Sequence, residues 1–253
     1  MKSRVSLAVL AIALVSVGCK GGAGSGAIAA GTPVELKLSA AKGDKYTADM
    51  TLTMTLSVPK DSKMPADQAK LLAGEQSLTL NATTTSELTD VSDGKYTWVD
   101  TITDVKADGK GMMTMMAGML SQMKGMKTTI VMDSRGKIIS QKTEGGPAGA
   151  STNSTGQIEG FGFPDKAVKV GDSWDSKVNT GGQDVTMKCT VTEITESSVM
   201  IDATMTGVEG LKMNGPMKVV LDRANGRPIS TVGEMEVNQG GAIAKMKLDM
   251  KRK

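Results

Sequence analysis

The most regular feature of the chain is an alternation of apolar and polar residues with a period of two. In the segment 50–56, Met50, Leu52, Met54 and Leu56 alternate with threonines. Such alternation places apolar side chains on one face of a β-strand and polar side chains on the other. The same pattern recurs at residues 34–38, 78–82, 185–191, 199–205, 217–221 and 246–250. The chain is therefore predicted to be mainly β.

Short turn signals separate these alternating segments. They are Asp93-Gly94, Asp108-Gly109, Arg135-Gly136, Gly181-Gly182, Asn225-Gly226 and Gly240-Gly241. Short strands joined by such turns predict an antiparallel meander with one buried face. A sheet of about 10–12 strands must curl or close in order to cover that face. We therefore expect a curved antiparallel sheet or half-barrel.

Two segments depart from the alternation and predict short helices. Residues 64–73 begin near Pro65 and end before Gly74, which is the usual arrangement of a helix start and stop. Residues 111–126 are rich in methionine, and a spacing of three and four residues puts one set of them on a single helix face. That face is the predicted ligand or partner contact surface, and it consists of Met112, Met116, Met119, Met123 and Met126.

The body of the chain, residues 33–253, is expected to form a single β-rich domain with two similar halves. The halves are residues 33–144 and 157–253, and the loop 145–156 between them is poor in apolar residues. Three pairs of segments echo each other in the same order: 42–46 and 170–174, 88–93 and 191–196, and 131–137 and 220–227. Both helical segments lie in the first half, where they are interpreted as insertions.

The N-terminus has the pattern of an export signal. Lys2 and Arg4 precede an apolar run at residues 5–15, which is shorter than the roughly 20 residues that span a bilayer. The segment 14–19 that follows, LVSVGC, resembles the lipobox of bacterial lipoproteins. The resemblance implies that residues 1–18 are a signal peptide and that Cys19 carries a covalent lipid. The alternative is ordinary signal-peptide cleavage, which releases a soluble exported protein.

The lipobox resemblance also implies a location. The protein would be exported and anchored to a bacterial membrane through Cys19, facing the periplasm or the exterior. Residues 19–32 are rich in glycine and alanine and read as a flexible, lipidated tether. Lys20 directly follows the cysteine, which favours the outer membrane under the enterobacterial sorting rule.

Composition excludes several classes of function. The chain contains no histidine and only two cysteines, so no Ser-His or Cys-His pair can form and common zinc sites are disfavoured. The net charge is only +3, which gives no indication of nucleic-acid binding. Cys189 lies within an alternating segment and is interpreted as a small apolar core residue. We predict no catalytic residue, no metal site and no cofactor beyond the lipid on Cys19.

Four functional interpretations follow from these features. The first is a non-enzymatic lipoprotein that binds a lipid, another apolar ligand or an apolar partner along the methionine-rich helix. The second is a structural or interaction lipoprotein of the cell envelope with a filled core. The third is a Cu(I) protein, since thioethers are soft ligands. The fourth is a hydrolase that uses two carboxylates, drawn from the pairs Asp90/Asp93, Asp100/Asp104, Asp172/Asp175 and Glu193/Glu196.

The segment 163–174, FPDKAVKVGDSW, carries a resemblance of its own. It resembles a P-x-x-x-V-x-V-G-D-x-W motif of uncharacterised exported bacterial lipoproteins, a family of unknown function, so it implies no activity. Gly171 and Asp172 are expected to make a turn, and Trp174 is expected to anchor the following strand. The layout as a whole is similar to the periplasmic lipoprotein carriers and receptors, whose curved half-barrels hold lipid in an apolar cavity.

Overall fold

The structure is a computed structural model, which describes residues 32–59, 62, 64–145, 162–180, 183–207, 210–239 and 241–253. The predicted signal peptide, Cys19 and most of the tether lie outside these residues, as does most of the loop 145–156. Cleavage and lipidation therefore stay predictions. Within the described residues, no helix is both long enough and apolar enough to cross a membrane.

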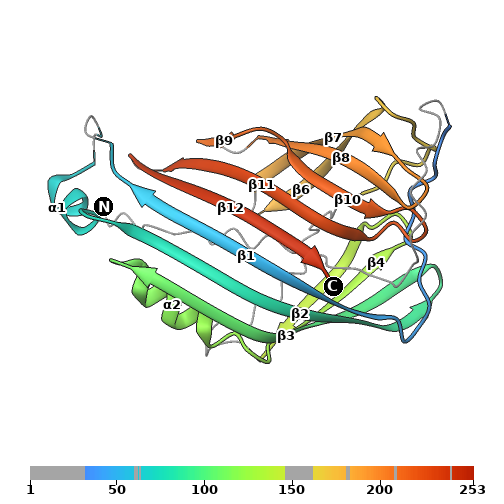
Figure 1. The fold of residues 1–253 in the computed structure, drawn as a ribbon, viewed down its shortest axis with the longest axis horizontal. Coiled ribbons are helices and arrows are strands. Elements are labelled where there is room, and N and C mark those ends of the chain that lie inside the picture. Colours follow the sequence, from blue (N-terminus) through green and yellow to red (C-terminus); the bar gives the residue numbers. More distant parts are fainter. Residues whose placement is uncertain are drawn as a thin grey trace.

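The described chain folds into one curved antiparallel sheet of twelve strands (Figure 1). Its order is β5-β4-β3-β2-β1-β12-β11-β10-β8-β7-β6, and β9 pairs with β11 off this path. The sheet is not closed, because β5 and β6 form its two edges. This confirms the predicted mainly β, curved antiparallel architecture. The strands are β1 (Lys45–Ser57), β2 (Gln76–Ser92), β3 (Lys95–Lys110), β4 (Lys127–Asp133), β5 (Ile138–Glu144), β6 (Ser173–Thr180), β7 (Gln183–Ile194), β8 (Ser198–Thr206), β9 (Leu211–Met213), β10 (Met217–Asp222), β11 (Pro228–Gln239) and β12 (Ala242–Arg252).

The turn before β1 is repeated before β6, as the sequence echoes suggest. Before β1, the N–H of Gly43 donates to the Leu88 carbonyl at 2.8 Å, and the N–H of Leu88 donates to the Asp44 carbonyl at 2.9 Å. Before β6, the N–H of Gly171 donates to the Val191 carbonyl at 2.8 Å, and the N–H of Val191 donates to the Asp172 carbonyl at 2.9 Å. Each aspartate also accepts a hydrogen bond from the backbone N–H three residues earlier. The residues equivalent to Gly43, Leu88 and Asp44 are Gly171, Val191 and Asp172.

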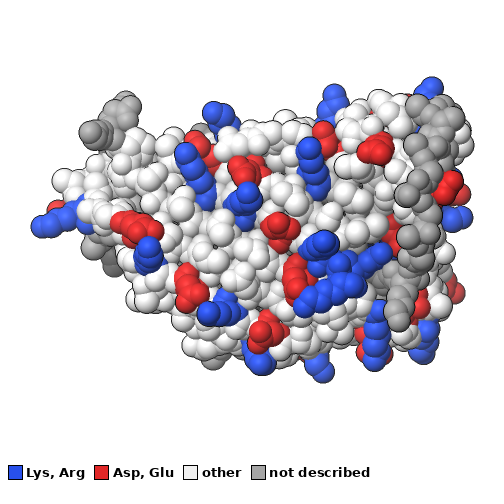
Figure 2. Space-filling model, viewed as in Figure 1, with Lys and Arg blue, Asp and Glu red and all other residues white. Residues whose placement is uncertain are grey.

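The register gives the sheet an apolar inner face and a polar outer face. On β1, Met50, Leu52 and Met54 share the inner face with the core, while the threonines between them face outward. Charged residues of both signs are scattered over the outer face among uncharged residues (Figure 2). Some of these charges pair across strands, as Lys247 does with Glu234 at 3.1 Å. The inner face is therefore the surface on which the chain can bury apolar groups.

One end of the half-barrel, which we call the closed end, is sealed by the segments that precede β1 and β6. Val34 forms a β-bridge with Val168, so the two segments pair with each other. The N–H of Leu38 donates to the carbonyl of Ser134 in the β4–β5 turn at 2.7 Å, and the N–H of the next residue donates to the carbonyl of Asn225 in the β10–β11 turn at 3.1 Å. The first segment thus ties both halves together. Buried apolar side chains fill this end: Val34, Leu36, Leu38, Phe163 and Val168.

The opposite end, which we call the open end, carries the long connections and both helices. These are α1 (Ala66–Leu71) and α2 (Met113–Ser121), and both belong to the first half, as expected. The two helices are shorter than the segments predicted for them. In particular, α2 stops at Ser121, so Met123 and Met126 lie beyond its end. The expected continuous methionine face therefore does not extend over the whole segment 111–126.

Candidate ligand-binding site on the inner face

The inner face at the open end is apolar but only half-buried. The register places its residues on the neighbouring strands β1, β12, β11 and β9, and on β3, which is separated from β1 by β2. Methionine is flexible and polarizable, so a surface rich in it can adapt to ligands of different shape. We call this surface the open-end surface. It comprises Met50, Leu52, Met54, Leu56, Ile102, Val105, Ala107, Leu211, Met213, Val237, Ala244 and Met246.

Helix α2 lies over one side of the open-end surface. Met113 and Ala117 are buried against Leu78, and the neighbouring side chains of Met54 and Leu56 pack against the same cluster. The contact is close because β3 has a glycine below the helix. A Cβ at Gly109 would overlap the backbone of Met113. The glycine therefore sets how near the helix can approach the sheet.

The structure separates the five methionines that the sequence assigned to one contact face. Met116 packs against the sheet, whereas Met112 is 54% exposed and Met119 is 57% exposed. Met123 and Met126 are half-buried after the end of the helix. The helix presents Met113, Ala117 and Leu120 to the sheet instead, together with Met116. A role of the five predicted methionines in ligand contact stays a prediction.

The closed end of the inner face contains a buried aromatic and polar cluster that the sequence did not reveal. Arg227 is completely buried, and its guanidinium lies 3.6 Å from the centroid of the Trp98 ring. The Tyr46 ring lies 6.0 Å from Trp98, edge to face, and 5.8 Å from the same guanidinium. Stacking on two rings is a favourable way to hold an arginine away from water.

Asp100 belongs to the same cluster. It lies opposite Ser86 in the β2–β3 register and is 8% exposed. Burial raises the pKa of this carboxyl to about 7, although hydrogen bonding to Ser86 and the charge of Arg227 both act to lower the pKa. Burial, with a contribution from Asp100, also raises the pKa of Tyr46 well above its ordinary value. At neutral pH, Asp100 is therefore divided between its charged and neutral forms.

A second arginine, Arg252, which is partly buried, closes the cluster on the side of β12. Arg252 lies opposite Ala48 on β1, and its Nη2 donates to Asp222 Oδ2 at 3.1 Å. This ion pair is largely excluded from water. Both carboxylates of the cluster, Asp100 and Asp222, lie near arginine charge, as buried carboxylates generally require.

The four acidic pairs do not form the facing carboxylates that a hydrolase needs. A β-bulge between Thr83 and Thr84 shifts the register, so Asp100 points inward while Asp104, opposite Thr83, lies on the outer face. Asp104 is exposed and pairs with Lys124 at 3.4 Å. The other pairs lie at or beside turns at the closed end. Among the described residues, no group of three or more Asp, Glu or Cys side chains could hold a metal ion.

The structural motif residues lie at the turn before β6 and at the start of β6. Gly171 has a φ of +90°, which favours glycine. Asp172 Oδ2 accepts a hydrogen bond from the Lys169 N–H at 3.0 Å. Trp174 is half-buried against the core, and its Nε1 donates to the Gly162 carbonyl at 2.9 Å. The neighbouring Cys189 is fully buried, and burial raises the pKa of its thiol to about 12.

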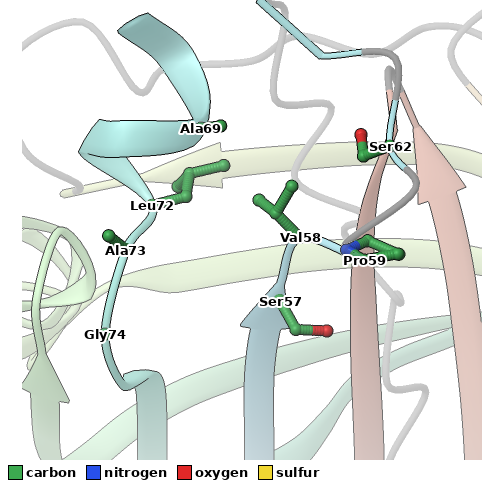
Figure 3. A pocket seen from close by; sticks show the side chains of 8 residues that line it. All are labelled: Ser57, Val58, Pro59, Ser62, Ala69, Leu72, Ala73 and Gly74. Atoms are coloured by element: carbon green, nitrogen blue, oxygen red, sulfur yellow. The ribbon is translucent and has the colours of Figure 1, made fainter. Parts of the chain in front are cut away.

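Two open pockets lie at opposite ends of the molecule. One, of about 400 Å³, lies at the closed end beside Phe163 and Trp174. The other, of about 460 Å³, lies at the open end between the end of β1 and helix α1, where Val58 and Leu72 project into it (Figure 3). Neither pocket is lined by α2. The pocket between β1 and α1 adds apolar surface beside the open-end surface.

Comparison with known proteins identifies the fold and no more. No family model and no curated protein matches the chain. A structure describing lipid–protein interactions in lipovitellin superposes with a TM-score of 0.50 at 10% identity, over 84% of this chain. The chain spans 25% of the length of that lipovitellin chain. A DUF1329 family protein from Desulfovibrio piger aligns with a TM-score of 0.28 at 9% identity, over 82% of this chain and 85% of that protein's chain. DynF from the dynemicin biosynthesis pathway of Micromonospora chersina aligns with a TM-score of 0.23 at 10% identity, over 90% of this chain and 92% of the DynF chain.

Proposed function

We propose that the protein is a non-enzymatic, exported lipoprotein that holds a lipid or similar apolar ligand on the inner face of its half-barrel. The open-end surface carries this proposal. Its dozen apolar side chains share the inner face at the open end and are only half-buried, although the buried residues of β2, Leu248 and Met235 lie among them. Soluble proteins rarely leave a continuous apolar surface in contact with water without a functional reason.

The arrangement of the two ends supports the same proposal. The closed end has a core of buried side chains. The open end combines methionines, a short helix packed on the sheet and an adjacent open pocket, which are properties of an adaptable binding surface. The resemblance of the chain's layout to lipoprotein carriers, and the shared fold with part of lipovitellin, are in keeping with lipid as the ligand.

A lipid anchor on Cys19 would hold the protein at a membrane. The tether of residues 19–32 would join the membrane to the closed end, where Val34 is paired. The protein would thus be held at a bacterial membrane, outer by the Lys20 rule, while its open end stays accessible. The membrane is its expected partner, and no further cofactor is proposed.

The test is binding of a fluorescent fatty acid to the protein without residues 1–19. Leu52→Glu places a charge in the open-end surface, whereas Thr53→Glu makes the same addition on the outer face of the same strand. We expect Leu52→Glu to weaken binding at least tenfold, because a carboxylate is costly to bury, and Thr53→Glu to leave it unchanged. Circular dichroism establishes that both variants fold.

The alternative is an envelope protein with a filled interior that docks a protein partner. It predicts no bound lipid by native mass spectrometry and no fatty-acid uptake by the wild type. Either result, with folded protein, would remove the ligand-binding proposal. The absence of α2 from both pocket linings is the observation that favours this alternative.

A further inference from the structure

Along β1 towards the closed end, the inner face changes from the apolar open-end surface to the buried cluster that contains polar groups. Met50, the last half-buried residue of β1 on the inner face in the direction of the closed end, lies opposite Met250 on β12. The next inner position, Ala48, lies opposite Arg252, and the one after it, Tyr46, lies opposite Ser86, the partner of Asp100. Two residues of a strand span about 7 Å. The polar cluster thus begins one step beyond the apolar surface.

The cluster contains buried polar atoms that have no well-aligned hydrogen-bond partner in the described part of the chain, although Ser86 lies close enough to the Tyr46 hydroxyl to lower its pKa. They are Tyr46 Oη, Trp98 Nε1, Asp100 Oδ1 and Arg252 Nη1. Tyr46 is 7% exposed and Trp98 is 1% exposed, so water at the molecular surface does not serve these atoms. Native proteins leave few such atoms unpaired, because each costs free energy. Four of them at one place point to a missing partner.

The chemistry of these atoms defines the partner. The hydroxyl of Tyr46, the indole N–H of Trp98 and the guanidinium of Arg252 are donors. Asp100 becomes a donor as well when it is protonated. The partner must therefore be an acceptor, and a carboxylate is the strongest acceptor that can sit at the end of an alkyl chain.

We propose that the ligand is a fatty acid whose carboxylate binds at Tyr46, Trp98, Asp100 and Arg252 while its alkyl chain runs along the open-end surface. This inference rests on the proposed function and specifies its ligand class. The charged group that acts on Asp100 is Arg227 before β11, and the ionisable Tyr46 on β1 also lies near Asp100. Arg252 on β12 acts on Tyr46 and pairs with Asp222 on β10. A bound carboxylate favours the protonated form of Asp100, which then shares its proton with the ligand.

The first experiment compares dodecanoate with dodecanol, its uncharged counterpart of equal chain length. Both are titrated by calorimetry into wild type, Tyr46→Phe and Tyr96→Phe. Tyr96 is the matched control, because its hydroxyl already donates to the Leu38 carbonyl at 3.2 Å. We expect Tyr46→Phe to weaken dodecanoate about tenfold, as loss of one hydrogen bond to a charged group does. Tyr96→Phe should leave dodecanoate affinity unchanged, and neither substitution should affect dodecanol.

The second experiment uses pH. Because the bound carboxylate requires a protonated Asp100, dodecanoate affinity should fall about tenfold between pH 6 and pH 8, with uptake of one proton. In Asp100→Asn the affinity should stay constant over this range. Dodecanol affinity should not depend on pH in either protein.

The results separate this inference from the proposed function. Equal binding of dodecanoate and dodecanol, with Tyr46→Phe behaving like Tyr96→Phe, would overturn the carboxylate site and leave an apolar groove. Failure of both compounds to bind folded wild-type protein would overturn the proposed function together with the carboxylate site.

Discussion

The two ends of the half-barrel use the same strands for different purposes. At the closed end the turns are short, two chain segments cross between the halves, and aromatic rings and an arginine are buried together. At the open end the connections are long and methionines replace the rings. Under the proposed function, the closed end would contribute most of the fold stability and the open end would bind the ligand. The closed end holds the sheet in its curve, which leaves the open end free to adapt.

The largest expected effect is on stability at the closed end. Trp98→Ala removes a buried ring that packs on both Tyr46 and Arg227, so we expect the free energy of unfolding to fall by about 3–5 kcal/mol. Met246→Ala, at a half-buried inner position of the open end, should cost about 1 kcal/mol, because neighbouring methionines can fill the space. Urea unfolding followed by circular dichroism measures both. Equal losses would mean that the two ends are packed alike.

The next effect is the pH dependence that Asp100 imposes. Its pKa is raised from 3.8 to about 7 on folding. The folded state therefore binds more protons than the unfolded state between these values, and stability should fall as pH rises from about 4 to 7, then level off. Asp100→Asn should be more stable than wild type above pH 7, by roughly 4 kcal/mol at most. Unfolding curves of both proteins at pH 5 and pH 8 test this, and a constant difference would contradict it.

Thiol reactivity gives a third contrast between the two regions. Cys189 is buried on the inner face of β7, and its raised pKa of about 12 keeps it as a neutral thiol. In protein without residues 1–19, it should react with a maleimide at least about a hundredfold more slowly than a cysteine at Leu52→Cys in a Cys189→Ser background. The rates are followed by mass spectrometry. Comparable rates would show that the β7 region opens as readily as the open end.

The smallest effects concern the seat of α2. Gly109→Ala introduces a Cβ that overlaps the Met113 backbone, so it should lift the helix and cost about 1–3 kcal/mol. Gly118→Ala is the matched control within the helix, where a Cβ meets open space. It should stabilise the helix by up to about 1 kcal/mol. Hydrogen exchange of the residue 113–121 amides should be faster in the first variant and slower in the second.

The sequence predicts the strands well because each has one buried face. Alternation on β1, β10 and β12 reports that burial directly, and the turn residues mark the strand ends. The echo between residues 42–46 and 170–174 corresponds to a turn with the same hydrogen bonds in both halves. These signals are local, so they can be read without knowing how distant strands pair.

The orientation of α2 could not be predicted because its periodicity carries little information. In GMMTMMAGMLSQMKGM, apolar residues occur on every side, so spacing alone selects no unique face. The sheet selects it, through the space above Gly109. The burial of Asp100 was hidden for a related reason. A β-bulge in the register turns Asp100 inward and Asp104 outward, and a bulge of this kind leaves no clear mark in the sequence.

The central claim is that the open-end surface holds an alkyl chain, and photo-crosslinking tests it most directly. A fatty acid with a diazirine near its methyl end is bound to the protein without residues 1–19, irradiated, and mapped by peptide mass spectrometry. We predict label on inner-face residues of β1 and β12, around Leu52, Met54 and Met246. Label confined to the exposed methionines of α2, or equal label on the threonines of the outer face, would contradict the account.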